Sequence, residues 1–330
     1  MKNLIIMSAM LQMFADVNLN TQTTGTESLS AEMKTYYSDY LIDFANPNLV
    51  HDQFGQKHPI PKNGGKTIEF RKYTPFGKAT TPLREGFTPD GGSLEVSTVE
   101  ATVEQYGYYI TLSDMLILTA VDNNLVEATK LLGAQAGCTL DTITREILNG
   151  GTNVMYSGSK LAREALADGD KLTVDDIYKA ARALKQQNAP KINGMYVAII
   201  HPDVAYDLMR NEEWIDVHKY SATTEIFEGE IGKIAGVRFV ETTEAKIFAK
   251  GAGTKDVYST LVLGANAYGV TEVTGGGLEH IVKQLGSGGT ADPLNQRATA
   301  GWKAIKTAER LVENYMIRIE SVSTFDSGAN

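Results

Sequence analysis

Apolar and polar residues alternate along this chain with two different periods, which divide it into predicted helices and strands. A spacing of three to four residues predicts helices over 28–44, 113–149, 175–187 and 202–211. Alternation every second residue, or a short apolar run, predicts strands over 68–73, 98–112, 196–200, 257–263, 280–285, 302–305 and 315–320. Residues 230–240 indicate a hairpin. The sequence therefore predicts an α+β fold.

The longest helical pattern begins at the capping residue Ser113 and ends at Asn149, before two glycines. Its predicted inward face consists of Leu118, Val121, Leu125, Ala128, Leu132, Leu140, Ile143 and Ile147. The polar run 122–124 predicts a break in this pattern. A main helix of about 26 residues then remains, which is roughly 39 Å long at 1.5 Å per residue.

A long connection, Thr74 to Leu94, contains three prolines and several glycines but almost no apolar run. Loops of this length are usually functional or ordered by a partner, so we expect it to protrude and rest on another surface. Its outgoing limb is basic and its return limb acidic: Lys66, Arg71, Lys72, Lys78 and Arg84, against Glu85, Asp90, Glu95, Glu100 and Glu104. These charges can pair across the hairpin or bridge to a neighbouring copy.

The strand pattern over 98–112 changes phase. Odd positions are apolar up to Val103, whereas even positions are apolar from Tyr108 onward. This change predicts a β-bulge near Gly107.

The first residues allow two interpretations. Lys2 followed by the apolar run 4–11 resembles a short signal-peptide core. Gln12 interrupts that run, and Met7, Met10, Leu11 and Phe14 follow helical spacing, which favours an amphipathic arm that docks on another surface.

Composition narrows the function classes. Forty acidic against 31 basic side chains give a net charge of −9, which opposes broad contact with nucleic acid or anionic lipid. Because Cys138 is the single cysteine, no internal disulfide can form. No apolar run approaches the roughly 20 residues that a membrane helix needs, so no membrane contact is expected.

The sequence predicts no cofactor, metal or catalytic site. The glycines at 286–289 lack the lysine and helix of a phosphate loop, and the five histidines show no metal-ligand spacing. His201 and Asp203 follow a buried strand and could form an acid–base pair, but capping of the next helix explains them better. Most of Asp114, Asp122, Asp141, Asp175 and Asp176 are expected on solvated faces or caps.

Several short words, in order, resemble the N-four-type family of major capsid proteins of tailed bacteriophages. The most informative is Thr80–Pro89 (TTPLREGFTP), followed by Gln105–Ile110 (QYGYYI) and Ser113-Asp114. The resemblance continues through Thr139–Asp141, Gly151–Val154, Ile200–Asp203, Gly229–Gly232, Gly289–Gln296 and Gly301–Lys303. It covers roughly residues 28 to 322.

The resemblance implies the fold shared by tailed-phage and herpesvirus capsids. Residues 1–65 would form an N-terminal arm and helix, 66–112 an extended β-hairpin loop, and 113–171 a peripheral domain with a long spine helix. Residues 172–285 would form the axial α/β domain, and 286–330 the return strands of the peripheral domain.

The resemblance also implies a non-enzymatic shell protein that assembles into hexamers and pentamers of an icosahedral head around double-stranded DNA. Its partners would be further copies of itself, portal and scaffolding proteins and a decoration protein, with assembly in the host cytoplasm and the product in the virion. Inter-subunit contacts would come from Lys78, Thr81, Pro82, Leu83, Arg84, Glu85, Phe87 and Pro89. An encapsulin-like compartment shell and an enzyme centred on His201 and Asp203 are the alternatives.

Overall fold

The computed structural model describes residues 41, 45, 49–59, 66–73, 76–82, 85–86, 91–119, 124–219, 232–250, 253–272, 278–288 and 292–330. The chain divides into two compact units. The smaller unit includes residues 107–134 and 279–303, and the larger unit comprises 45–106, 135–278 and 304–330. The predicted N-terminal arm and most of the helix expected over 28–44 lie outside the described residues.

A seven-stranded mixed sheet forms the core of the larger unit, with strand order β5-β15-β10-β6-β8-β7 and β9 paired to β10. The strands are β5 (Val154–Tyr156), β6 (Tyr196–Ile200), β7 (Lys233–Ile234), β8 (Val237–Glu241), β9 (Ile247–Phe248), β10 (Val257–Leu263) and β15 (Met316–Val322). Every residue of β6, β10 and β15 is buried. Burial on both faces explains why β6 and β10 are apolar runs without alternation.

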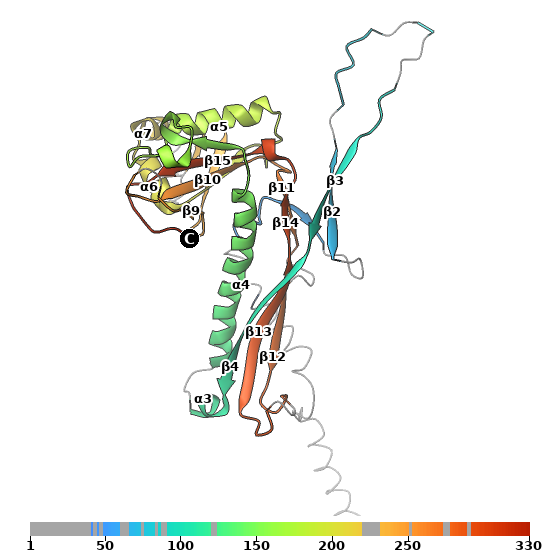
Figure 1. Ribbon diagram of the computed structural model, residues 1–330, viewed down its shortest axis with the longest axis vertical. Helices are drawn as coiled ribbons and strands as arrows, with labels where there is room; N and C mark the ends of the chain where they lie inside the picture. Colours follow the sequence, from blue (N-terminus) through green and yellow to red (C-terminus); the bar gives the residue numbers. More distant parts are fainter. Residues whose placement is uncertain are drawn as a thin grey trace, which may run out of the picture. The chain divides into compact units, whose positions relative to one another are not determined.

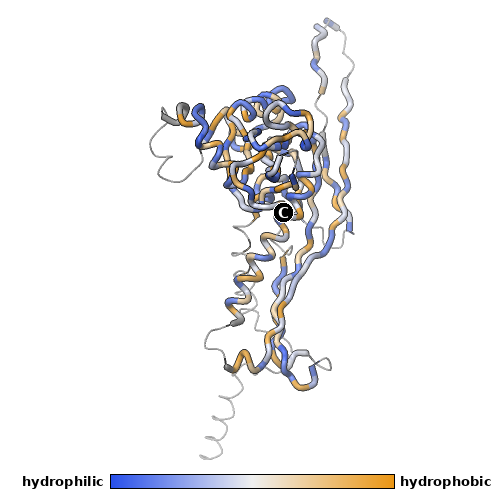
Figure 2. Tube along the Cα trace, turned by 60° about the vertical axis from the view of Figure 1, so that its left-hand side comes forward, coloured by the Kyte–Doolittle hydropathy of each residue, from blue (hydrophilic) through white to orange (hydrophobic). Residues whose placement is uncertain are grey.

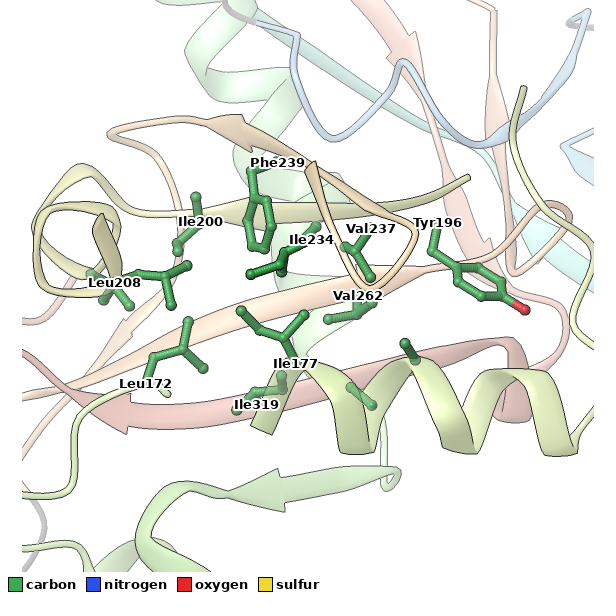
Figure 3. Packing of buried hydrophobic residues seen from close by; sticks show 14 of the residues in the cluster. Leu172, Ile177, Tyr196, Ile200, Leu208, Ile234, Val237, Phe239, Val262 and Ile319 are labelled. Carbon is green, nitrogen blue, oxygen red and sulfur yellow. The ribbon is translucent and has the colours of Figure 1, made fainter. Parts of the chain in front are cut away.

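Three helices belong to this sheet region: α5 (Val174–Gln186), α6 (Pro202–Met209) and α7 (Glu212–Lys219). Thr173 and Asp176 form a reciprocal capping box that starts α5. Ile177 of α5 faces Val262 and Ile319 of the sheet, within the main hydrophobic core (Figure 3). Three short 3-10 turns complete this part: η2 (Ser157–Ser159), η3 (Arg163–Ala165) and η5 (Glu313–Tyr315).

Two smaller β-structures also belong to the larger unit. β1 (Gln56–His58), β11 (Tyr268–Thr271) and β14 (Ala308–Arg310) form a three-stranded sheet in that spatial order. β2 (Thr67–Tyr73) and β3 (Val96–Thr102) form an antiparallel ribbon that carries the long connection at its far end (Figure 1).

The smaller unit contains a three-stranded sheet of order β12-β13-β4, followed by a short helix. The strands are β12 (Leu278–Lys283), β13 (Arg297–Lys306) and β4 (Glu104–Ser113), and the helix is α3 (Asp114–Thr119). Glycine permits a close approach of β4 and β13, because an ideal Cβ at Gly301 would lie 2.7 Å from the Cβ of Tyr109.

The long helix α4 (Asn124–Asn149) has 26 residues, and a separate helix, α3, precedes it. The predicted break and helix length are therefore confirmed. The assignment of Leu118 to a buried face was wrong, because that side chain is 80% exposed on α3.

The predicted phase change is also present, but not at Gly107. The interruption falls at Val103, between β3 and β4, where the Val103 N–H donates to the Lys66 carbonyl (2.8 Å). Buried or half-buried residues are odd-numbered before this point and even-numbered after it. Val103 therefore marks the place where the strand changes from one sheet partner to another.

Candidate assembly surface

The long connection is anchored at its root by the β2–β3 ribbon. Ile68, Phe70 and Ala101 are buried on one face of the ribbon, in a cluster with Leu311 that begins just after β14. The pairing register sets Ile68 opposite Ala101 and Phe70 opposite Val99, so one face of both strands is apolar. The root is therefore held by a small hydrophobic core within the larger unit.

Phe70 is the centre of this root. Its side chain is fully buried, and the ring of His58 packs edge-on against it with centroids 4.8 Å apart. An ideal Cβ at Gly269 of β11 would overlap the Phe70 ring. The absence of a side chain at position 269 therefore creates the space that the ring fills.

Beyond the root, the described part of the connection is exposed. Of the predicted contact residues, Lys78, Thr81, Pro82 and Glu85 are described and exposed, whereas Leu83, Arg84, Phe87 and Pro89 lie outside the described residues. Their contacts with other copies stay a prediction.

Sequence reasoning missed three apolar side chains on the same limbs. Phe76 is 66% exposed, Leu94 59% and Val96 46%. Large apolar side chains gathered on one exposed segment indicate a surface that another molecule covers. We call residues 76–96 the distal limb. Isolated apolar residues between prolines and glycines give no periodic signal, so only exposure in the structure identifies them.

The charges of the ribbon differ from the expected pairing across the hairpin. The register places Glu69 opposite Glu100, and Arg71 opposite Thr98. Both glutamates are exposed. Like charges directly opposite each other destabilise a sheet pair, so the ribbon is not held by alternating charge at this position.

A second feature of the larger unit is a group of buried polar residues beside α4. The backbone N–H of His51 donates to Asp141 (2.7 Å), and the His51 Nδ1 lies 2.7 Å from the other oxygen of the same carboxylate. The Thr144 hydroxyl donates to Asp52 (2.6 Å), which also pairs with Lys306. We call these five residues the α4 polar cluster. It fastens the segment at 51–52 and the end of β13 to the helix.

This cluster corrects the expectation that Asp141 lies on a solvated face, because its side chain is fully buried. Asp114 and Asp176 do cap helices, as predicted. Nearby, the Tyr268 hydroxyl donates to the His51 carbonyl. Burial, with the charges of Asp52 and Asp141, raises the pKa of Tyr268 well above its usual value and keeps it a donor.

His201 and Asp203 adopt the geometry of a helix start. The Nδ1 of His201 accepts a hydrogen bond from the backbone N–H of Asp203 (3.2 Å), while the Asp203 carboxylate accepts from the hydroxyls of Tyr258 (2.8 Å) and Ser327 (2.5 Å). Burial lowers the pKa of His201, although the Asp203 charge opposes this. The capping interpretation explains every one of these contacts.

Among the residues that the structure describes, no group of His, Cys, Asp and Glu side chains could hold a metal ion. Cys138 is half-buried in α4, and burial together with Glu244 and Asp141 raises its pKa, which disfavours the reactive thiolate. No helix in the described ranges is long and apolar enough to cross a membrane.

Comparisons of the structure show which fold this is. The capsid of Ralstonia phage GP4 is similar with a TM-score of 0.64 and 17% identity, over 81% of this chain and 86% of that chain. The capsid of cyanophage P-SCSP1u gives 0.63 and 16%, over 93% and 94%. A virus-like particle from Pyrococcus furiosus gives 0.51 and 12%, over 88% and 100%. At these identities the likeness shows the fold alone.

The sequence comparison shows the family. No curated protein matches the chain by sequence. The sequence model of a phage capsid protein family matches residues 95–308, which is well over half of the chain. The chain belongs to this family of phage capsid proteins, and it is a structural major capsid protein of the virion.

Proposed function

We propose that this capsid protein forms hexamers and pentamers of an icosahedral head that encloses double-stranded DNA, and that the distal limb of one copy lies across the next copy. The observation that carries this proposal is the contrast between a buried root and an exposed apolar limb. Phe70 is fully buried, whereas Phe76 and Leu94 are more than half exposed. A neighbouring copy would supply the burial that the chain itself does not provide.

The domain assignment is part of the proposal. Residues 66–112 would be the extended loop, 113–171 the peripheral domain with α4 as spine helix, 172–285 the axial domain and 286–330 the return strands, with 1–65 as arm. The fully buried sheet of β6, β10 and β15 supports one rigid body that can hold its shape in differently sized rings.

The partners follow from this role. Portal and scaffolding proteins and a decoration protein would contact the shell during assembly in the host cytoplasm, and packaged DNA would lie near its inner wall without tight binding. The net charge of −9 supports weak contact with phosphates. The role is structural and needs neither catalysis nor a cofactor.

A compartment shell of the encapsulin type is the second candidate, supported by likeness to the virus-like particle of Pyrococcus furiosus. The phage capsid family match favours a virion. The contents of purified particles distinguish the two, because a head holds double-stranded DNA and a compartment holds protein cargo.

The decisive experiment changes the distal limb. We expect Phe76→Ser with Leu94→Ser, and separately Leu83→Ser with Phe87→Ser, to leave the monomer folded but to prevent capsomer and shell formation. Each apolar side chain contributes about 1.5 to 3 kcal/mol when fully buried. Leu161→Ser is the matched control, because Leu161 is 95% exposed outside this limb.

Negative-stain microscopy and light scattering give the readout, with circular dichroism as the test of folding. Normal particles from both double variants would contradict the loop contact. Stable monomers from the wild type under every condition, including coexpression with scaffolding factors, would contradict the shell itself. Intact shells from the His201→Ala and Asp203→Ala double variant would argue against the enzyme alternative.

A further inference from the structure

The helix α3 exposes all of its large apolar side chains. Met115 is 61% exposed, Leu116 and Ile117 are each 44% exposed and Leu118 is 80% exposed. A surface helix of a globular protein normally buries one apolar stripe. Figure 2 shows α3 as a continuous hydrophobic stretch at the end of its sheet. The chain thus places four consecutive apolar residues where water reaches each of them.

A further exposed leucine lies beside this helix, within the smaller unit. The backbone N–H of Asp114, the first residue of α3, donates to the carbonyl of Gln296 (3.0 Å). Leu294, two residues before Gln296, is 74% exposed. We call Met115–Leu118 together with Leu294 the apolar tip. None of these five side chains is charged, and a patch of this kind marks a contact with another molecule.

Symmetry indicates what the apolar tip contacts. A loop of one copy lying on the body of the next is a heterologous contact, and repeated contacts of that kind close a ring. Rings join into a shell only through an additional surface. The apolar tip belongs to the smaller unit, whereas the distal limb belongs to the larger unit, so the two surfaces are built from different parts of the chain.

Charge favours a second copy as the occupant. Each chain carries a net charge of −9, so two copies repel each other through most of their surface. An uncharged apolar surface avoids that repulsion. It is also complementary to itself, which allows identical tips to meet around a symmetry axis.

We propose that the apolar tip joins capsomers, by packing against the apolar tip of copies in neighbouring rings. This inference rests on the proposed shell function and adds the surface through which rings connect. It is separate from the distal-limb contact, which acts between copies of one ring.

The first test compares Met115→Gln/Leu118→Gln/Leu294→Gln with the control Leu131→Gln/Leu161→Gln. The control residues are 72% and 95% exposed outside the tip. We expect the tip variant to form rings, while the protein concentration needed for shells rises at least about tenfold, equivalent to about 1.4 kcal/mol. The control should assemble as the wild type does.

Shells from the tip variant at the wild-type concentration would overturn the proposal. Loss of rings together with shells, with the monomer still folded by circular dichroism, would also overturn it, because the tip would then act within rings. If the wild type forms no particles at all, the proposed function fails and this inference fails with it.

The second test needs no disruptive change. Particles carrying Leu118→Cys are treated with a short bismaleimide cross-linker, with Leu161→Cys particles as control, and Cys138 is present in both. We expect covalent dimers of the capsid chain from Leu118→Cys at several times the control yield. Equal yields, or cross-links only to a different protein such as a scaffold, would overturn the tip-to-tip contact.

Discussion

The ring of Phe70 occupies the space that a side chain at Gly269 would need. We expect Gly269→Ala to lower the free energy of unfolding by about 1 to 3 kcal/mol, because the buried ring must move to admit the methyl group. Displacement of Phe70 would also shift the root of the extended loop. Urea unfolding and a particle assay measure the two effects.

Gly91→Ala is the matched control for this change. Gly91 lies in the distal limb, and an ideal Cβ there has no atom within 4 Å. We expect unchanged stability of the monomer. If Gly269→Ala also left stability and assembly unchanged, Phe70 would not be the anchor of the loop.

Lys306 and Asp52 form a buried ion pair in the α4 polar cluster, and the Lys306 side chain is fully buried. Lys306→Met leaves the Asp52 carboxylate with only the Thr144 hydroxyl, so we expect a loss of about 3 to 5 kcal/mol. Lys306→Met combined with Asp52→Asn should recover part of this loss, because no unpaired charge then remains buried. Chemical unfolding of the two single variants and the double variant completes a double-mutant cycle.

An exposed ion pair serves as the comparison. Lys130 and Glu127 are 2.7 Å apart on α4, with side chains 33% and 59% exposed. Lys130→Met should change stability by less than about 1 kcal/mol. Equal losses from Lys130→Met and Lys306→Met would show that burial of the pair has no energetic weight.

Asp207 makes stability depend on pH. Burial acts to raise its pKa, but hydrogen bonds from Thr324, Ser323 and Lys171 together lower the pKa below the ordinary value. A lowered pKa means that the carboxylate stabilises the folded state above the unfolded pKa of about 3.9, and that this stability is lost as the pH falls through the folded value. We expect Asp207→Asn to cost about 1 to 3 kcal/mol at pH 7 and progressively less below about pH 4.

Unfolding free energies at pH 7, 5, 4 and 3 test this dependence. Asp175→Asn is the control, because Asp175 is 65% exposed in an ion pair on α5 and its loss should matter little. A difference between the wild type and Asp207→Asn that stays constant over this range would show that Asp207 is not the group responsible.

Local patterns determined much of the fold. The 26-residue length of α4 and the strands β6 and β10 followed from the apolar periodicity, and Thr173 with Asp176 start α5 because their side chains satisfy the first N–H groups. These features depend on neighbours within a few residues. The same holds for His201, whose role as a helix cap follows from the proline after it.

Other features depend on distant parts of the chain. His51 meets Asp141 across 90 positions, so nothing near either residue indicates a buried pair. Leu118 was assigned to a buried face because periodicity identifies apolar residues in phase but not whether anything covers them. The same limit hid Phe76 and Leu94, whose exposure identifies the distal limb.

Glu69 and Glu100 lie opposite each other in the β2–β3 ribbon, and this repulsion leads to the last prediction. We expect Glu100→Gln to stabilise the ribbon by about 0.2 to 1 kcal/mol, because like charges directly across a strand pair are destabilising. That gain corresponds to amide hydrogen exchange in β2 and β3 up to about fivefold slower. Glu95→Gln is the control, because Glu95 lies just before the paired residues of β3. Faster exchange in Glu100→Gln would show that the two carboxylates are held together by a cation, and its dependence on added salt would then identify the screening.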